Sequence, residues 1–387
     1  MRSITFYIVF SIIILIYAAI NYYIYRRAIQ AIPQNWNIKT IFTIAFIVIA
    51  ASYLLGRWME KVWLSTASDI FVWVGSFWLA AMVYFLFAVL LLDLLRLVNH
   101  WLPFLPDFIK SNYGSAKAYT LGIVTAGVLI TIFSGYINSV NPRIYSMEID
   151  IPKRVNGMDQ LKIALVSDIH MGTTFTKKRV QGMVERINSL EPDIILMAGD
   201  IVDEDLAPVI RQDLGGYLTK LKAKYGSIAV TGNHEYIGGA EEAIKYLEAH
   251  NVKFVRDTSV LIDNKFYIVG REDRAMENFT ERKRKPLKEL MKDVDLNFPV
   301  IMMDHQPFAL GKVADALVDI QFSGHTHHGQ LFPFNFITNM VYQKSWGYLR
   351  IKDSHFYVSS GYGNWGPPIR TGNTTEIVNI ILKFTGK

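Results

Sequence analysis

Four long segments without a charged residue constrain the fold of this chain more than any other feature. No Asp, Glu, Lys or Arg occurs in residues 3–25, 40–56, 70–92 or 118–142. A helix of roughly 20 apolar residues is long enough to cross the hydrocarbon core of a bilayer. The sequence therefore predicts an N-terminal all-α transmembrane bundle of four helices.

Two of these segments have alternative interpretations. Residues 40–56 are the shortest, and a buried core helix is the alternative, but both neighbouring segments also have the length of a span. Residues 3–25 resemble a signal peptide in having Arg2 at the start and Ala18-Ala19 near a cleavage site. The length of this segment without a charge and the further spans that follow it favour a helix that is kept in the mature protein.

The positive charges of the loops predict the orientation in the membrane. The loops after the first and third spans carry Arg26, Arg27, Lys39, Arg96, Lys110 and Lys117. The N-terminus and the loop after the second span carry only Arg2, Arg57 and Lys61. Cytoplasmic loops are enriched in Lys and Arg, so we expect a multi-pass protein of the cell membrane with an extracytoplasmic C-terminal domain. If Arg143, Lys153 and Arg154 after the last span are also counted, the two sides of the membrane carry equal numbers of Lys and Arg residues.

The texture of the sequence changes after Pro142. Short apolar runs alternate with glycine-containing turns and with charged stretches at helical spacing, which is typical of an α/β domain. Residues 143–151 alternate as a strand does, and residues 177–190 and 239–250 indicate helices. We therefore expect two parts, a transmembrane anchor at 1–142 and an α/β domain at 143–387.

Polar groups of the metal-binding type follow five of the predicted buried strands. The strands at 163–166, 194–198, 228–230, 300–303 and 320–322 lead into Asp168-x-His170, Gly199-Asp200, Gly232-Asn233-His234-Glu235, His305 and Gly324-His325-x-His327. Ligands bind at the carboxyl ends of strands in open α/β sheets. We therefore expect these groups to converge on one site.

The residue types in these turns indicate metal binding. A single Asp or His at a strand end is usually a turn or cap residue, but five of the nine histidines fall in these turns. Residues at i and i+2 of an extended segment point to the same side. Asp168-x-His170 and His325-x-His327 therefore each offer two ligands. The chain has no cysteine, so any metal must be held by nitrogen and oxygen donors.

In this order, the motifs resemble those of the calcineurin-like metallophosphoesterases. The resemblance extends from about Ile144 to the C-terminus, and the spans, the Gly-His-Thr-His-x-Gly-Gln motif and the terminal Gly-Pro-Pro-x-Arg segment resemble the bacterial membrane- and envelope-associated branch. It implies a mixed β-sandwich flanked by helices, with four αββα layers. It also implies two divalent metal ions, such as Mn, Zn or Fe.

The resemblance assigns a role to each motif. The first metal would be held by Asp168, His170, Asp200 and His327, and the second by Asp200, Asn233, His305 and His325. Asp200 would bridge the two ions, and His234 would protonate the leaving group without binding metal. Glu235 would either orient His234 or hold its turn, and Asp203 would support a ligand or cap a helix.

Three further features have a functional and an ordinary interpretation. Arg370, after the Gly-Pro-Pro turn, would contact a phosphate or be a surface arginine, and His328 would contact substrate or lie at the surface. The charged run 281–285 is expected to be a solvated face, with contact to anionic lipid as the alternative.

The sequence thus predicts a membrane-anchored phosphoesterase. It would hydrolyse a phosphate mono- or diester or a pyrophosphate with a hydroxide activated by two metal ions, and the tether favours a lipid-linked or envelope-derived substrate. The formal charge of +6 is spread along the chain, so nucleic acid is not the expected partner. A non-catalytic membrane scaffold is the alternative, but all seven ligand positions and His234 are present. A transporter is disfavoured because the spans lack embedded charges apart from Asp93 near a span end, and Asp93 is expected to pair with Arg96.

Overall fold

The structure is a computed structural model that describes residues 2–386, with side chains described from residue 8 onward. Contacts divide the chain into two compact units, Met1–Gly135 and Tyr136–Lys387. This division falls slightly before the boundary expected at Pro142, because the last turn of the fifth helix contacts residues of the second unit.

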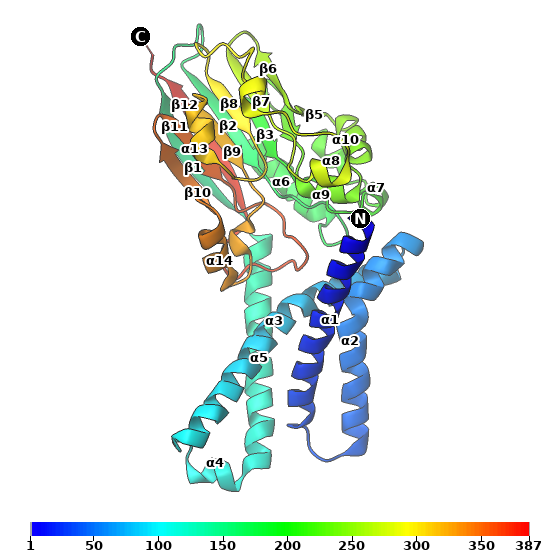
Figure 1. The fold of residues 1–387 in the computed structure, drawn as a ribbon. Helices are drawn as coiled ribbons and strands as arrows, with labels where there is room; N and C mark the ends of the chain where they lie inside the picture. The colour runs from blue at the N-terminus through cyan, green and yellow to red at the C-terminus, as the bar shows by residue number, and fades with distance from the viewer. Residues whose placement is uncertain (1, 387) are drawn as a thin grey trace. The chain divides into compact units, whose positions relative to one another are not determined.

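The first unit is entirely helical. Its elements are α1 (Arg2–Ile29), α2 (Trp36–Val62), α3 (Thr66–Trp101), α4 (Asp107–Ser111) and α5 (Tyr113–Val140), of which the last turn belongs to the second unit (Figure 1). Within the described residues, α1, α2, α3 and α5 are long and apolar enough to cross a membrane. The prediction of four apolar N-terminal helices is confirmed.

Two glycines let α2 and α3 pack closely. A Cβ atom at Gly75 would lie 2.2 Å from the backbone nitrogen of Tyr53, and one at Gly56 would lie 2.6 Å from that of Val72. Small residues are favoured where apolar helices meet, because they allow the backbones to approach. These glycines therefore explain why α2 and α3 form a tight pair.

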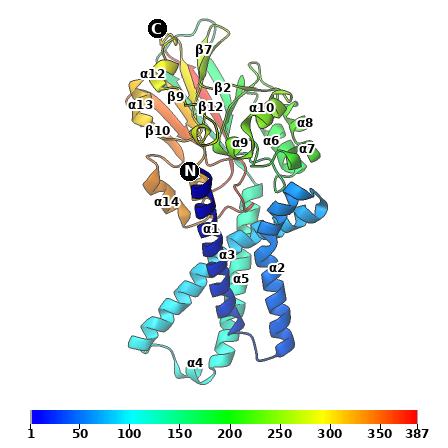
Figure 2. The same cartoon turned by 45° about the vertical axis from the view of Figure 1, so that its right-hand side comes forward.

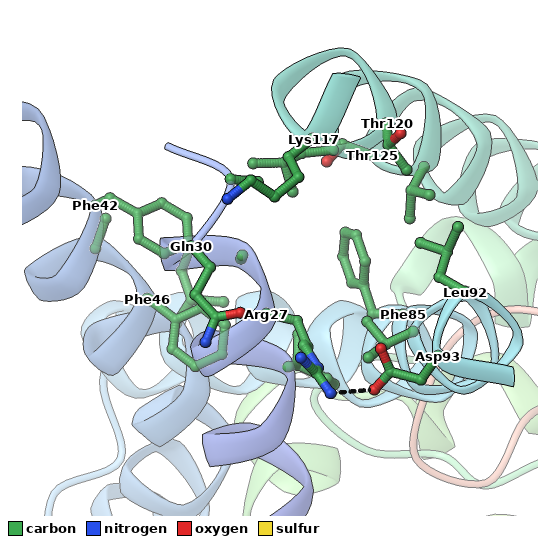
Figure 3. Close-up of a pocket in the computed structure, with 18 of the residues that line it drawn as sticks. Arg27, Gln30, Phe42, Phe46, Phe85, Leu92, Asp93, Lys117, Thr120 and Thr125 are labelled. Carbon is green, nitrogen blue, oxygen red and sulfur yellow. Dashed lines mark ion pairs between the residues drawn. The ribbon is translucent and has the colours of Figure 1, made fainter. Parts of the chain in front are cut away.

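Asp93 is the centre of a small polar cluster within the first unit. Its carboxylate lies 2.6 Å from Arg27 and 3.0 Å from Arg96, and it accepts a hydrogen bond from the hydroxyl of Tyr23. Figure 3 shows the Arg27–Asp93 pair at the edge of a cavity of about 270 Å³ that aromatic side chains of α2 and α3 also line. The expected pairing of Asp93 with Arg96 is confirmed, and Arg27 adds a second partner. Pairing reduces the cost of a carboxylate in apolar surroundings.

The second unit contains two six-stranded mixed sheets. The first has the order β1 (Arg143–Ile151), β12 (Glu376–Phe384), β2 (Gln160–Val166), β3 (Ile194–Ala198), β4 (Ser227–Val230) and β5 (Val252–Phe254). The second has the order β10 (Gly347–Ile351), β11 (Ser354–Val358), β9 (Ile320–Ser323), β8 (Val300–Met303), β7 (Phe266–Gly270) and β6 (Thr258–Ile262). The five strands predicted to precede metal-binding groups are all present.

The sheets pack face to face, and helices cover their outer faces. Apolar side chains of both sheets, such as Ile163 and Ile301, form one continuous core between them. A second core joins the first sheet to α6 (Lys177–Ser189) and α10 (Ala240–Glu248), and a third joins the other sheet to α12 (Leu287–Leu290) and α13 (Leu310–Asp315). Figure 2 shows α6, α8 and α10 on one side of the strands and α12 and α13 on the other. The predicted four-layer αββα fold is confirmed.

Short elements complete the second unit. They are α7 (Ala207–Arg211), α8 (Gly215–Leu218), α9 (Asn233–Gly238), α11 (Met276–Phe279), α14 (Phe334–Val341) and a 3₁₀ turn at His327–Gly329. Strands β2, β3 and β4 run parallel in the first sheet, as do β7, β8 and β9 in the second. Parallel strands end at a common edge, so the turns that follow them lie close together.

Candidate metal centre

The turns after the strands have an unusual backbone conformation. Asp168, His170, Asp200, His325 and His327 all have positive φ angles, between 44° and 71°. Few residues other than glycine adopt this conformation, and a cluster of such residues is typical of functional sites. Each turn reverses sharply and directs its side chain toward the same region.

Glycines next to these residues allow the chain segments to touch. A Cβ atom at Gly232 would lie 2.1 Å from Oδ1 of Asp200, and one at Gly324 would lie 2.2 Å from Oδ2 of Asp168. No side chain fits at these distances. The glycines of the two sequence motifs are therefore required by the close approach of the carboxylates.

The first group of predicted ligands is buried and compact. Ligand atoms of Asp168, His170 and His327 all lie within 4.8 Å of one another. Nε2 of His327 is 3.0 Å from Nε2 of His170 and 3.4 Å from Oδ1 of Asp168. Oδ2 of Asp200 lies 3.9 Å from Nε2 of His170, which brings the predicted bridging residue to this group.

The second group shares Asp200 with the first. Oδ2 of Asp200 lies 3.0 Å from Nε2 of His305, and His325 belongs to the same compact group. Nδ1 of His325 is 2.8 Å from Oδ1 of Asn233. All seven predicted ligands thus come together from both sheets, as two groups that meet at Asp200.

The contacts of His305 fit a metal ligand. Its Nδ1 is 2.7 Å from the carbonyl oxygen of Ala198 and donates to it, so in a neutral ring Nε2 carries a lone pair. Nε2 is buried, faces a carboxylate oxygen and has no hydrogen-bond partner among the described residues. The facing carboxylate therefore requires a positive charge between the two atoms, either a proton on Nε2 or a metal ion. The donor set of imidazole, carboxylate and amide oxygen therefore suits divalent metal ions.

The electrostatics of the two groups show how strongly these residues interact. Burial raises the pKa of Asp168, whereas the pKa of Asp200 is lowered, because nearby His305 and His234 outweigh its burial. Burial and the charge of His305 lower the pKa of His325 to about 3. Burial and the neighbouring His170 likewise keep the pKa of His327 well below its ordinary value. His325 and His327 are thereby kept neutral, as metal binding needs, whereas the charge of Asp200 outweighs the burial of His305 and raises the pKa of that ring well above its ordinary value.

His234 lies beside the first group and contacts an acidic residue. Its ring is 4.6 Å from that of His170, and its Nδ1 is 3.3 Å from Oδ1 of Asp203. The same oxygen lies 3.5 Å from Nδ1 of His170, so Asp203 stands between two histidines. Burial lowers the pKa of His234, but the charge of Asp200 and a hydrogen bond with Asp203 raise it to about 9.

Arg370 is not placed where it can meet a phosphate. Its side chain is fully buried and donates to the carbonyl oxygens of Ser360 and Gly363, both at 2.6 Å, and to Oδ1 of Asn364 at 3.0 Å. One terminal nitrogen also lies 3.0 Å from Nδ1 of His327. The structure therefore does not support the expected contact with substrate, because the guanidinium is committed to the core beside a predicted ligand.

His328, the other tentative substrate residue, lies against two residues of the next loop. Its Nδ1 is 2.8 Å from the hydroxyl of Ser345, and its ring is 5.4 Å from that of Trp346. Half-burial, together with the charges of Lys344 and Arg370, lowers its pKa. The structure brings it beside the metal-binding turn but not into either group of ligands.

Glu235 holds two of the turns together. Its Oε1 accepts hydrogen bonds from the backbone N–H groups of Ile201 and Val202, at 2.7 and 3.0 Å. Its Oε2 accepts from Gly232 and Asp200, at 2.7 and 3.1 Å. Of the two roles considered from the sequence, these contacts support holding the turn.

The last turn of α5 also contacts this region, and this contact was not predicted. The polar residues at 138–139, at the end of an apolar helix, are its only local sign in the sequence. Nδ2 of Asn138 donates to the carbonyl oxygens of Arg370 and Asn373, at 2.9 and 2.6 Å. Nδ2 of Asn364 donates to the hydroxyl of Ser139 at 2.7 Å. The segment that buries Arg370 is therefore fixed by the residues that immediately precede β1.

Comparison with known proteins identifies the family. Residues 161–329 match the family described as calcineurin-like phosphoesterase. A metallophosphoesterase of Helicobacter pylori is 32% identical over 71% of this chain and 74% of its own length. The chain belongs to the metallophosphoesterase family. The family predicted from the motifs is confirmed, and with it a metal-dependent phosphoester hydrolase.

Other relatives of this metallophosphoesterase extend over nearly the whole chain. An uncharacterized metallophosphoesterase of Campylobacter jejuni is 29% identical over 98% of this chain and 99% of its own length. A Danio rerio protein named transmembrane protein with metallophosphoesterase domain is 26% identical over 92% of this chain and 83% of its own. Together with the four apolar helices, these similarities indicate a membrane protein.

Substitution of Glu235 tests whether it holds the turns. In Glu235→Gln, an NH₂ group would face backbone N–H donors, so we expect the free energy of unfolding to fall by about 3 kcal/mol. Thermal unfolding of the detergent-purified protein measures this. Glu241→Gln, which alters an exposed carboxylate paired with Arg256, is the matched control and should change little. Equal stability of the two variants would contradict this role for Glu235.

Proposed function

We propose that this metallophosphoesterase hydrolyses a phosphate mono- or diester or a pyrophosphate at a centre that binds two divalent metal ions. The observation that carries this proposal is the position of Asp200. Its Oδ2 lies 3.0 Å from His305 and 3.9 Å from His170, so one carboxylate serves two ligand groups. A shared carboxylate is the arrangement that two neighbouring cations require.

The two groups divide the ligands between two ions. The first ion would be held by Asp168, His170, Asp200 and His327, and the second by Asp200, Asn233, His305 and His325. Bound divalent ions, such as Mn, Zn or Fe, would supply a hydroxide nucleophile at neutral pH and neutralise phosphoryl oxygens. The residues themselves would fix the positions of the ions and limit the access of bulk water, because five of the seven ligands are buried and Asn233 and His325 are only partly exposed.

His234 is the residue best placed to protonate the leaving group. Asp203 contacts Nδ1 of His234, which leaves Nε2 to donate a proton to the departing oxygen. The imidazole packs against His170 and lies near Trp365, whose ring is 6.3 Å away. His234 is therefore held beside the first group without being a member of the proposed ligand set.

Removal of single ligands tests the two-metal proposal. With Mn²⁺, the full-length protein in detergent should hydrolyse an aryl phosphodiester, and Asp200→Asn or Asn233→Ala should reduce turnover by more than about 100-fold. A chelator should abolish turnover, and Mn²⁺ should restore it. Asp205→Asn, on a partly buried residue of the loop after Asp200 that belongs to neither ligand group, is the matched control. Unchanged turnover in correctly folded ligand variants would contradict the proposal.

The proton-donor role of His234 is tested by varying the leaving group. His234→Gln should reduce kcat about 100-fold for an alkyl leaving group, which needs a proton, and far less for p-nitrophenol, which leaves as a stable anion. Steady-state rates over a series of leaving groups measure this difference. A loss independent of leaving-group pKa would assign His234 a structural role instead.

The proposal also covers the anchor and its orientation. We infer that residues 1–142 anchor the chain in the cell membrane and that residues 143–387 form the catalytic domain on the extracytoplasmic side. The distribution of Lys and Arg among the loops supports this orientation. Protease added to right-side-out vesicles should degrade the C-terminal domain, and protection of that domain would reverse the orientation.

The tether favours a lipid-linked or envelope-derived substrate, since the site is kept near a bilayer. Comparing the turnover of a phospholipid and of a soluble phosphodiester by the same preparation tests this preference. Faster turnover of the soluble compound would contradict a lipid-linked substrate.

A non-catalytic scaffold is the alternative function. The convergence of all seven proposed ligands on two groups that meet at Asp200 favours the enzyme.

A further inference from the structure

A second polar hollow follows strand β7 in the catalytic domain. Its cavity of about 310 Å³ is lined by Arg271, Arg274, Arg284 and Lys285, together with Glu277 and Pro286. We call the four cationic residues and the cavity that they line the basic pocket. The residues come from the connection between β7 and α12, which contains none of the predicted metal ligands.

The basic pocket holds more positive charge than its carboxylates balance. Oδ2 of Asp304 lies 3.0 Å from Arg271 and also pairs with Arg284, so one acid serves two guanidinium groups. Burial lowers the pKa of Arg271; Asp304 opposes this shift, while the charge of Arg284 adds to it. With Glu277 and Asp257 included, four cations face three carboxylates. An anion would relieve the repulsion among the cations.

Two buried donors in the wall of the pocket have no acceptor. The side chains of Arg271 and Arg284 are only 13% and 7% exposed. The Nε atoms of both lack a hydrogen-bond partner among the described residues. Buried donors are normally satisfied, and a ligand is one of the standard explanations when they are not. Arginine presents the fork of donors that matches phosphate oxygens.

Backbone contacts hold the pocket in shape. The carboxylate of Asp257 accepts the N–H groups of Glu272 and Lys285, at 3.0 and 2.7 Å, and so joins the two ends of the loop. Oε1 of Glu277 accepts the N–H of Arg284 at 3.2 Å. Because these contacts order the loop without an anion, binding would require little further loss of chain entropy.

The charged run at 281–285 is split by this arrangement. Arg282 points to the surface and pairs with Glu241 at 3.0 Å, with more than half of its side chain exposed. Arg284 and Lys285 instead line the pocket. The run is therefore a solvated face only in part, and its last two residues belong to the basic pocket.

Contacts connect the basic pocket to the metal centre. Asp304, which pairs with two of its arginines, immediately precedes the ligand His305. The guanidinium of Arg274 lies 4.7 Å from the ring centre of Phe308, which packs against Tyr342 at 5.0 Å. Tyr342 in turn lies 6.1 Å from His325. Two aromatic rings thus lie between the pocket and a proposed ligand.

We propose that the basic pocket binds a second phosphate group of the substrate while the first is hydrolysed at the metal centre. The ligand chemistry is a phosphate monoester, whose oxygens accept charge-assisted hydrogen bonds from arginine and lysine. The pocket would make the enzyme selective for substrates that carry two separate phosphate groups. This inference rests on the proposed function, because it assumes that the metal centre is where hydrolysis occurs.

Phosphate binding without metal tests the pocket by itself. After chelation, the full-length protein in detergent should bind inorganic phosphate, as measured by titration calorimetry. The variant carrying Arg274→Gln and Lys285→Gln should bind it at least about tenfold more weakly, because charge-assisted hydrogen bonds are lost. Both residues are exposed, so the fold should be kept. Lys283→Gln, an exposed neighbour outside the pocket, is the matched control and should bind as the wild type does.

Selectivity tests the link to catalysis. Two aryl phosphodiesters that differ only in a second phosphate group are compared with Mn²⁺ bound. We expect the wild type and Lys283→Gln to have a higher kcat/KM for the compound with two phosphates than for the compound with one. In the double variant the ratio of these two kcat/KM values should be at least about tenfold lower.

The outcomes separate this inference from the proposed function. Absence of phosphate binding by the wild type, or an unchanged kcat/KM ratio in the double variant, would overturn the inference. Phosphate binding without substrate selectivity would indicate a site for a lipid headgroup, and would also overturn it. If the wild type hydrolyses neither compound, the proposed function fails, while calorimetry still decides whether the pocket binds phosphate.

Discussion

The buried carboxylate of Glu235 is the contact on which the geometry of the metal centre depends. It accepts four backbone N–H groups from the turns after β3 and β4, and those turns carry Asp200 and Asn233. A charged acceptor in the protein interior forms stronger hydrogen bonds than a neutral one, and it fixes both turns at once. Asp200 is thereby held between the two ligand groups, although its own backbone has a positive φ of 53°.

The rest of the centre follows from burial. Carboxylates and imidazoles that water would normally solvate are packed at the ends of strands from two sheets, with Asp168 and His305 fully buried. Burial of such groups is unfavourable without a compensating charge, which bound metal ions would supply. The proposed ions would therefore stabilise the domain as well as serve catalysis.

Arg370 shows how the C-terminal part of the domain supports the centre. Its guanidinium is buried beside His327, and its carbonyl oxygen accepts a hydrogen bond from Asn138 in the last turn of α5. The carbonyl of Ser139 accepts from Thr375, immediately before β12. The residues immediately before β1 thus take part in the packing around a predicted ligand.

The seven predicted ligands were accessible to sequence reasoning because their signal is local. Each ligand follows a short apolar run or sits in a motif of a few residues, and parallel strands bring such positions to one edge of a sheet. The four apolar helices were predictable for a similar reason, since length and absence of charge are properties of a single segment. The αββα fold followed from the family resemblance and not from these patterns.

Other features depended on residues far apart in the sequence. Arg370 follows a Gly-Pro-Pro turn, which suggested an exposed position, but its partners Ser360, Gly363 and Asn364 enclose it in the core. The run 281–285 was read as one charged face, yet Asp257 and Asp304 direct Arg284 and Lys285 into a pocket.

The sequence by itself determined the four apolar helices, the α/β domain and the polar residues that follow its strands, because local patterns encode them. Only the tertiary structure decided which polar residues are buried, that Glu235 holds the turns and that four basic residues line one pocket. The physical reason is that burial and hydrogen-bond partners are set by the packing of distant segments, which no local pattern specifies.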